Sequence, residues 1–209
     1  MGARFAQLIV GLLLYGFTMA LMVQSGLGLD PWDVFHEGLT RHVPLSFGQV
    51  VIAVGAIVLL LWIPLRQRPG IGTVLNVLLI GLAADAGIAL VAAPDEMWAR
   101  VTLLVVGVVG NGLAGALYIG ARLGAGPRDG LWVAIVERTH LSVRLVRTSI
   151  ELTVLATGFL LGGTVGVGTA AYALAIGPLT QFFSARLPGR RAASRNAAQE
   201  LRHAPAYVV

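Results

Sequence analysis

The stretch LGLDPWD at residues 27–33 returns 96 residues later as LGAGPRD at residues 123–129. The same displacement aligns further short motifs without a gap: LS at 45–46 with 141–142, GIGT at 70–73 with GVGT at 166–169, and IG at 80–81 with 176–177. Several matches are glycine, proline or aspartate, which an apolar composition alone would not align. The sequence therefore predicts two homologous halves.

The composition places both halves in a membrane. Hydrophobic residues make up 56% of the chain, charged residues only 12%, and the mean hydropathy is +0.81. Soluble domains carry about 25% charged residues. Because about 20 apolar residues cross a bilayer, we expect an all-α polytopic protein with six spans, near residues 5–24, 47–65, 72–92, 101–121, 146–163 and 168–185.

The arginines set the expected orientation. With the N-terminus inside, thirteen of the fifteen basic residues are cytoplasmic, and only Arg41 and Arg100 lie outside. Each half has three spans, so the second half enters the membrane from the opposite side, and the two repeats are inverted. We predict a multi-pass protein of the bacterial inner membrane with both termini in the cytoplasm. The repeats are residues 1–95 and 96–187, followed by a basic, disordered tail, 188–209.

A polar segment separates the first and second spans of each half. Pro31 and Pro127 suit the first turn of a helix, and Asp33 and Asp129 favour its positive N-terminus. Two placements stay open. The segments are either re-entrant helices whose aspartates border a polar path, or amphipathic helices lying flat at each interface. Tryptophans within both segments favour the second placement.

The repeated GxGT motif stands before the third span of each half. We interpret Gly72 and Gly168 as parts of a glycine turn, and Thr73 and Thr169 as helix N-caps. A flexible gate or an ion-lining backbone is the alternative.

Ionisable residues inside apolar spans carry more information, because an aspartate at the centre of a span costs about 2.5–3.5 kcal/mol. Asp85 lies in the third span without an arginine at helical spacing. It is the candidate for a residue linked to protons or cations. Glu151 follows Arg147 by four residues, which indicates a local ion pair as an alternative to a transport role.

Several motifs together resemble the bacterial YczE-like membrane proteins, of the YczE, YyaS and YitT group. They are LGLDPWDVFHEGL, RPGIGTVLN, LYIGARLGAGPRDGL, SVRLVRTSIEL, GGTVGVGT and AIGPL. The resemblance covers residues 8–187, and its most specific part is the second copy, from Gly120 to Leu131. It implies an integral plasma-membrane protein and no agreed substrate or reaction.

Inverted repeats are typical of secondary transporters, with the substrate site at the repeat interface. We therefore predict a small-solute or ion-coupled transporter with a path bordered by Asp33, Asp85, Asp129, Arg128, Arg147 and Glu151.

A non-transporting scaffold that acts through partner proteins is the main alternative. An enzyme is not expected, because Ser46 and Ser142 have no convergent base, and Asp33 and Asp129 are predicted on opposite membrane faces. The chain has no cysteine and no HExxH spacing, so we expect neither a metal nor a cofactor. The arginines follow the edges of apolar segments, which argues against nucleic-acid binding. Homo-oligomerisation stays open.

Overall fold

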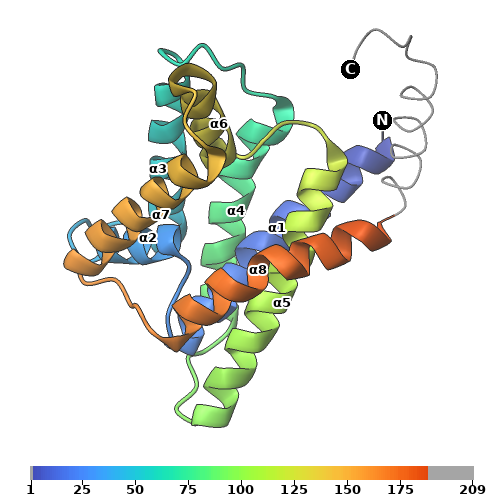
Figure 1. Ribbon diagram of the computed structural model, residues 1–209. Coiled ribbons are helices and arrows are strands. Elements are labelled where there is room, and N and C mark those ends of the chain that lie inside the picture. The colour runs from blue at the N-terminus through green and yellow to red at the C-terminus, as the bar shows by residue number, and fades with distance from the viewer. Residues whose placement is uncertain (1, 188–209) are drawn as a thin grey trace, which may run out of the picture.

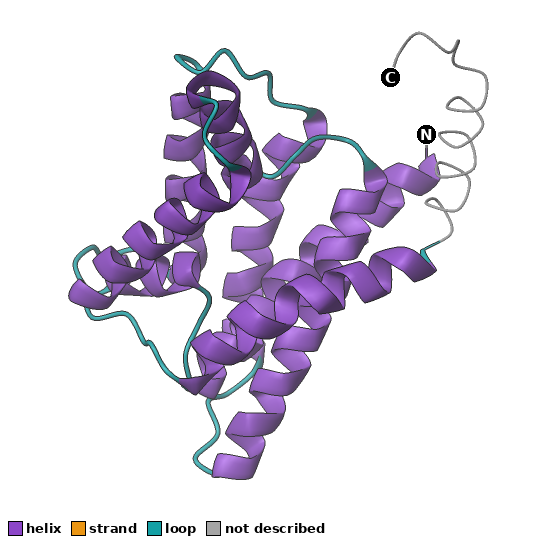
Figure 2. Ribbon diagram, viewed as in Figure 1, coloured by secondary structure: helices purple, strands orange, loops and turns teal. Residues whose placement is uncertain are grey.

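The computed structural model describes residues 2–187, and this part of the chain is all helical, without strands (Figures 1 and 2). The predicted all-α class is confirmed. The tail prediction, residues 188–209, lies outside the described residues. The helices are α1 (Gly2–Ser25), α2 (Pro31–Thr40), α3 (Phe47–Trp62), α4 (Ile71–Leu90), α5 (Met97–Ala121), α6 (Pro127–Thr139), α7 (Val143–Leu160) and α8 (Val167–Arg186).

Three pairs of equivalent helices in the two halves begin 96 residues apart. Pro31 and Pro127 open α2 and α6 at the first helical position, where a missing N–H costs nothing. The same spacing separates the starts of α3 and α7, and of α4 and α8. The repeated motifs therefore mark the boundaries of repeated elements.

The helix starts agree with the sequence pattern at α3 and differ from our expectation at α4 and α8. Ser46 caps α3 in a capping box with Gln49, as the SxxQ spacing indicates. Thr73 and Thr169 were predicted as N-caps, and this is wrong: both stand at the third position of their helices, after Gly70 and Gly166. Each threonine hydroxyl accepts a hydrogen bond from the N–H of its glycine, at 3.1 and 3.2 Å. Glycine can take the cap position because the threonine satisfies its N–H from inside the helix.

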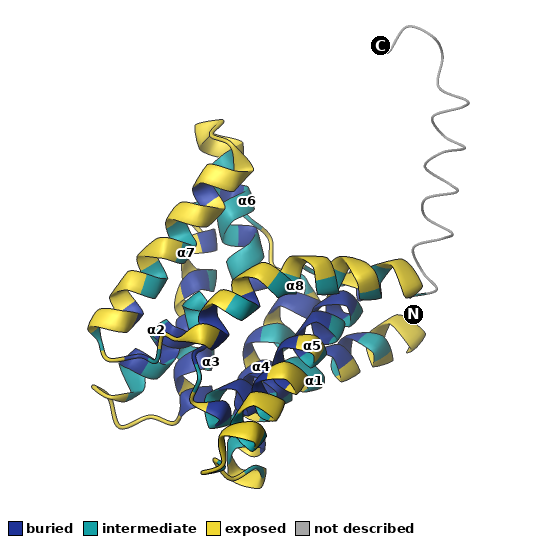
Figure 3. Ribbon diagram, turned by 60° about the horizontal axis from the view of Figure 1, so that its bottom comes forward, coloured by how far each residue is buried: buried dark blue, intermediate teal, exposed yellow. Residues whose placement is uncertain are grey.

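Three of the described helices are long and apolar enough to cross a membrane by length and composition: α1, α4 and α5. α3 is a shorter apolar helix, and the ionisable residues of α7 lower its apolarity. Large apolar side chains lie on the outside of the molecule, including Leu90, Leu160 and Leu174, each more than three-quarters exposed. Figure 3 shows that every described helix except α2 has exposed residues along part of its length. Such a surface suits contact with lipid.

α1 is the central helix, packed against α4 and α5 (Figure 1). Its glycines permit the close approach. A Cβ on Gly16 would lie 2.2 Å from the carbonyl oxygen of Ile80, and one on Gly11 would lie 2.8 Å from the backbone nitrogen of Tyr118. Small residues at helix contacts are the usual means of association in lipid, where burial of apolar surface supplies no driving force.

The loops before α2 and α6 are held by reciprocal hydrogen bonds between the halves. Gly72 N–H donates to the carbonyl of Leu123, and Gly168 N–H donates to the carbonyl of Leu27, both at 2.8 Å. The two hydrogen bonds are equivalent, because the 96-residue displacement converts the residues of one bond into those of the other. Each GxGT motif thus fixes the loop that leads into the short helix of the other half.

The equivalence of the halves fails at one helix pair. α3 packs tightly on α4, because a Cβ on Gly81 would lie 2.5 Å from the carbonyl of Gly48. In the second half Arg144 stands where Gly48 stands in the first. A Cβ on Gly177, the equivalent of Gly81, would have no neighbour within 4 Å in the described part of the chain. α7 therefore diverges from α8 (Figures 1 and 3).

Alanine substitution of these two equivalent glycines has opposite predicted effects. Gly81→Ala forces a methyl into the α3–α4 contact, and we expect a loss of about 1–3 kcal/mol of stability. Gly177→Ala adds a methyl in open space and gains helix propensity, by up to about 1 kcal/mol. Thermal unfolding of the purified variants in detergent measures both. Equal destabilisation by the two changes would contradict the proposed difference between the helix pairs.

Candidate functional site

The N-terminal ends of the two short helices contact each other through their side chains. The Arg128 guanidinium of α6 lies 5.0 Å from the ring centroid of Trp32 on α2, a cation–π contact. One of its nitrogens lies 3.7 Å from Oδ1 of Asp33. Trp32 and Arg128 are equivalent positions of the repeat, so the two P-x-D segments contact each other instead of lying apart.

Buried acidic side chains surround this contact on α2. Asp30 is the N-cap of the helix and accepts hydrogen bonds from the N–H groups of Trp32 and Asp33 at 2.9 and 3.2 Å. Asp33 lies one turn from His36, with 3.1 Å between Oδ1 and Nδ1. Asp33 and His36 are fully buried, and Asp30 is 4% exposed.

The second copy of the motif has different partners. The Tyr118 hydroxyl donates to Oδ2 of Asp129 at 2.6 Å, and the Tyr118 ring stands edge-on to that of Tyr15. Nearby, the Tyr172 hydroxyl donates to the buried side chain of Asn111 at 3.0 Å. These aromatic and amide groups form a polar lining between α1, α5, α6 and α8.

Two cavities adjoin the contact between the short helices. The larger has a volume of about 410 Å³ and is lined by Arg147 and Glu151 of α7 together with Tyr172 of α8. The smaller, of about 100 Å³, is lined by residues of α3 and α4. Both cavities share a wall, which consists of Tyr15, Trp32, Tyr118, Arg128 and Asp129.

The two cavities occupy equivalent places in the two halves. In the smaller cavity the α3 side is Val51, Val54, Gly55 and Val58. In the larger one the α7 positions equivalent to the first three are Arg147, Ile150 and Glu151. The α3 side of the smaller cavity is therefore apolar, whereas the equivalent α7 side of the larger cavity carries an arginine and a glutamate. The difference in size between the cavities matches the packing of the helix pairs, because α3 packs closely on α4 whereas α7 stands away from α8.

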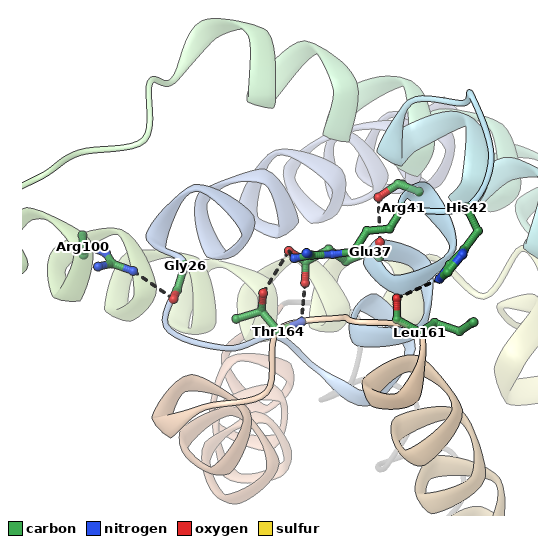
Figure 4. Close-up of polar contacts among 8 residues, drawn as sticks. Gly26, Glu37, Arg41, His42, Arg100, Leu161 and Thr164 are labelled. Carbon is green, nitrogen blue, oxygen red and sulfur yellow. Dashed lines mark hydrogen bonds and ion pairs between the residues drawn. The ribbon is translucent and has the colours of Figure 1, made fainter.

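The far end of α2 is tied to the loop between α7 and α8 (Figure 4). The Glu37 carboxylate accepts hydrogen bonds from the N–H and the hydroxyl of Thr164, at 2.5 and 3.0 Å, and lies 3.9 Å from Arg41. His42 Nε2 lies 3.1 Å from the carbonyl of Leu161. These contacts fix the direction in which α2 presents its N-terminus.

The turn before α2 is fixed from the other side. Arg100 donates to the carbonyls of Ser25 and Gly26 at 2.7 and 2.9 Å (Figure 4). Gly26 and Gly28 have φ angles of +59° and +116°, which explains the glycines of this turn.

The structure brings together most of the residues that we predicted to border a path. Asp33 contacts Arg128, while Asp129, Arg147 and Glu151 line the larger cavity. Arg147 and Glu151 also form the expected ion pair, at 2.9 Å. Pro31 and Pro127 start the short helices, and Gly72, Thr73, Gly168 and Thr169 hold the adjoining loops. The side chain of Arg128, the residue before Asp129, reaches Asp33 from the other half. The placement of Asp33 and Asp129 on opposite membrane faces stays a prediction.

Asp85 lies elsewhere. The hydroxyl of Ser46 donates to its carboxylate at 2.5 Å and the N–H of Gly48 at 2.7 Å, so Asp85 binds the N-terminus of α3. It lines neither of the two cavities. Its partners indicate that it closes the α3–α4 pair.

Sequence reasoning missed Asp30 and His36 as members of the site. The helix-start pattern contained the signal for Asp30, since the residue before a proline at the first helical position is the N-cap. His36 stands one turn after Asp33, a spacing that places both on one helix face.

Comparisons with known proteins give the family. The profile of a family described as "Family of unknown function (DUF6198)" matches residues 2–185. An "Uncharacterized protein" of Haemophilus influenzae is 41% identical over 184 residues, which cover 87% of this chain and 84% of the relative. The "Uncharacterized membrane protein YczE" of Bacillus subtilis is 36% identical over 174 residues, covering 82% of this chain and 81% of YczE. No solved structure matches.

Removal of the Asp85 carboxylate tests its structural role. Asp85→Ala deletes two hydrogen bonds to a helix N-terminus, and we expect a loss of about 1.5–3 kcal/mol of stability. Asp95→Ala, at an exposed loop position, is the control and should change little. Thermal unfolding in detergent measures the difference. An unfolding midpoint equal to that of the unmodified protein would show that this cap is not stabilising.

Proposed function

Since the chain belongs to the DUF6198 family and is a YczE-like membrane protein, we propose that it transports a small solute across the bacterial plasma membrane, with its path between the two halves. The observation that carries the proposal is the pair of cavities separated by the Trp32–Arg128 contact. In alternating access, one site at the interface of the repeats opens to each side of the membrane in turn. Two cavities that share a wall at the contact between the halves suit this mechanism. We propose no catalytic role.

The proposed topology has six crossings, by α1, α3, α4, α5, α7 and α8, with α2 and α6 as re-entrant helices. The reciprocal hydrogen bonds of Gly72 and Gly168 support an arrangement in which one half exchanges with the other. The arginine distribution supports cytoplasmic termini. In this orientation Asp85 and Ser46 close the outer end of α3, and Arg147 faces the cytoplasmic side.

The two helix pairs then represent the two states of a carrier. The α3–α4 pair is closed on the outer side, and the α7–α8 pair is open on the inner side, which corresponds to an inward-facing protein. Rocking of one half against the other would widen the smaller cavity and narrow the larger one. The open space at Gly177 is where α7 would approach α8.

The larger cavity defines the class of solute. A volume of about 410 Å³ lies within the range of small-molecule sites, roughly 300–1,000 Å³. Its walls combine aromatic rings with Arg147, Glu151 and Asp129. A small polar organic molecule with at least one charge, held against the rings, fits this lining.

Single cysteines test the inverted topology, because the chain contains no cysteine of its own. Leu45 and Leu141 are equivalent, exposed and placed just before α3 and α7. We expect a membrane-impermeant maleimide to label Leu45→Cys in intact cells and Leu141→Cys only after permeabilisation. Labelling of both from the same side would contradict inversion.

Solid-supported membrane recordings on proteoliposomes test transport. We expect at least one member of a panel of amino acids, monocarboxylates and quaternary amines to produce a current. Arg147→Gln should reduce its apparent affinity by at least about tenfold, the effect of losing one charged contact of about 1.5 kcal/mol.

The matched control for that change is Arg144→Gln, one helical turn earlier on α7. Arg144 is exposed and does not line the larger cavity, so its removal should leave the current unchanged. A protein that gives no more current than protein-free liposomes with every solute would contradict the transport proposal.

A further inference from the structure

Three buried polar atoms near the N-terminus of α2 have no hydrogen-bond partner among residues 2–187: Oδ2 of Asp30, Oδ2 of Asp33 and Nε2 of His36. They belong to three side chains that are at least nine-tenths buried and occur within seven residues. Buried polar atoms are nearly always partnered, so a cluster of three unpartnered atoms points to a missing group. We call Asp30, Asp33 and His36 the acid cluster.

The missing group has to supply a hydrogen-bond donor. An ionised carboxylate only accepts hydrogen bonds. When Nδ1–H of His36 donates to Asp33, as the 3.1 Å distance indicates, Nε2 is an acceptor as well. All three unpartnered atoms are therefore acceptors. Another anion or a carbonyl would not satisfy any of them.

The charges lead to the same conclusion. Two ionised carboxylates face one guanidinium, that of Arg128, which lies 3.7 Å from Asp33. One negative charge then remains uncompensated at a buried position, at a cost of several kcal/mol. Tyr15 from α1, Tyr172 from α8 and Glu37 on α2 itself are the other titratable groups beside the cluster, and none of them is positive. The cavity that Asp30 lines also contains Asp129, Arg147 and Glu151. Arg147 is paired with Glu151 at 2.9 Å, so these three residues add no net positive charge.

From this geometry we propose that the acid cluster binds one proton, held by the carboxyl group of Asp30 or Asp33. A proton turns one acceptor into a donor and cancels the excess charge. A second N–H on His36 would also cancel the charge, but it would leave Oδ2 of Asp30 and Oδ2 of Asp33 both as unpartnered acceptors, and the imidazole ring stands edge-on to Phe47. Hard metal cations take oxygen ligands, and the imidazole favours a proton over them.

The cluster has a route to water and a link to the solute cavity. Asp30 lines the larger cavity, whereas Asp33 and His36 lie behind it. A proton that reaches Asp30 from this cavity can pass to Asp33, where it weakens the ion pair with Arg128. Arg128 also lines the cavity and becomes free to bind an anionic group of the solute. The proton is thus the coupling ion of the proposed transporter, and this last step alone rests on the proposed function.

Infrared spectroscopy of the full chain in liposomes tests the site directly. The carbonyl stretch of a protonated carboxyl group is separate from that of a carboxylate, and aspartate labelled with ¹³C at the carboxyl carbon identifies its source. We expect one such protonated aspartate band at neutral pH in the unmodified protein. The band should disappear in Asp30→Asn or Asp33→Asn and persist in Asp95→Asn, which alters an exposed aspartate.

We expect Asp30→Asn to fold like the unmodified protein. Asparagine caps helices as well as aspartate does and retains the acceptor for the N–H groups of residues 32 and 33. Three results would overturn the proposal. They are absence of the band at neutral pH, its persistence in both cluster variants, and its loss on addition of sodium at constant pH, which would identify an alkali cation as the ligand.

The experiment separates this site from the transport proposal, because it needs neither a solute nor a flux. A protonated cluster in a protein that carries no current would leave the proton site standing and remove its coupling role. Currents from a protein that lacks the infrared band would support the transport proposal and contradict the proposed proton site.

Discussion

The contact of Arg128 with Trp32 and Asp33 is the constraint on which the rest of the arrangement depends. A partly buried guanidinium needs both an aromatic face and a carboxylate, and these come from the other half of the chain. The N-termini of α2 and α6 must therefore meet. For them to meet, the loops before them must be fixed, which the reciprocal bonds of Gly72 and Gly168 accomplish.

Single residues break the equivalence of the halves, and they do so where it affects the cavities. Glycines at 48 and 81 let α3 close on α4, and Asp85 holds the closed end. Arg144 replaces the first of these glycines in the second half, and the space at Gly177, the counterpart of the second, is open. One repeat therefore has the closed form and the other the open form of the same helix pair.

The sequence was sufficient to predict those features of the fold that depend only on residues close together in the chain. Proline at the first helical position and the SxxQ spacing mark helix starts that depend only on neighbouring residues. The role of Asp85 could not be predicted, because its partners lie on another helix, 39 and 37 residues away. His36 was missed for a related reason. Its sequence surroundings are polar, and only the packing of α2 inside the protein buries it.

The divergence of the two motifs follows from electrostatics. Positions 32 and 128 are equivalent and face each other, so an exact repeat would place two arginines or two tryptophans in contact. Two arginines would repel, and two tryptophans would leave Asp33 without a cation. Only an unlike pair satisfies the contact. The same reasoning applies to the positions on either side of this contact, where Asp30 and His36 of the first half correspond to Gly126 and Trp132 of the second. A second acid cluster beside the first would add negative charge that the single central arginine could not balance.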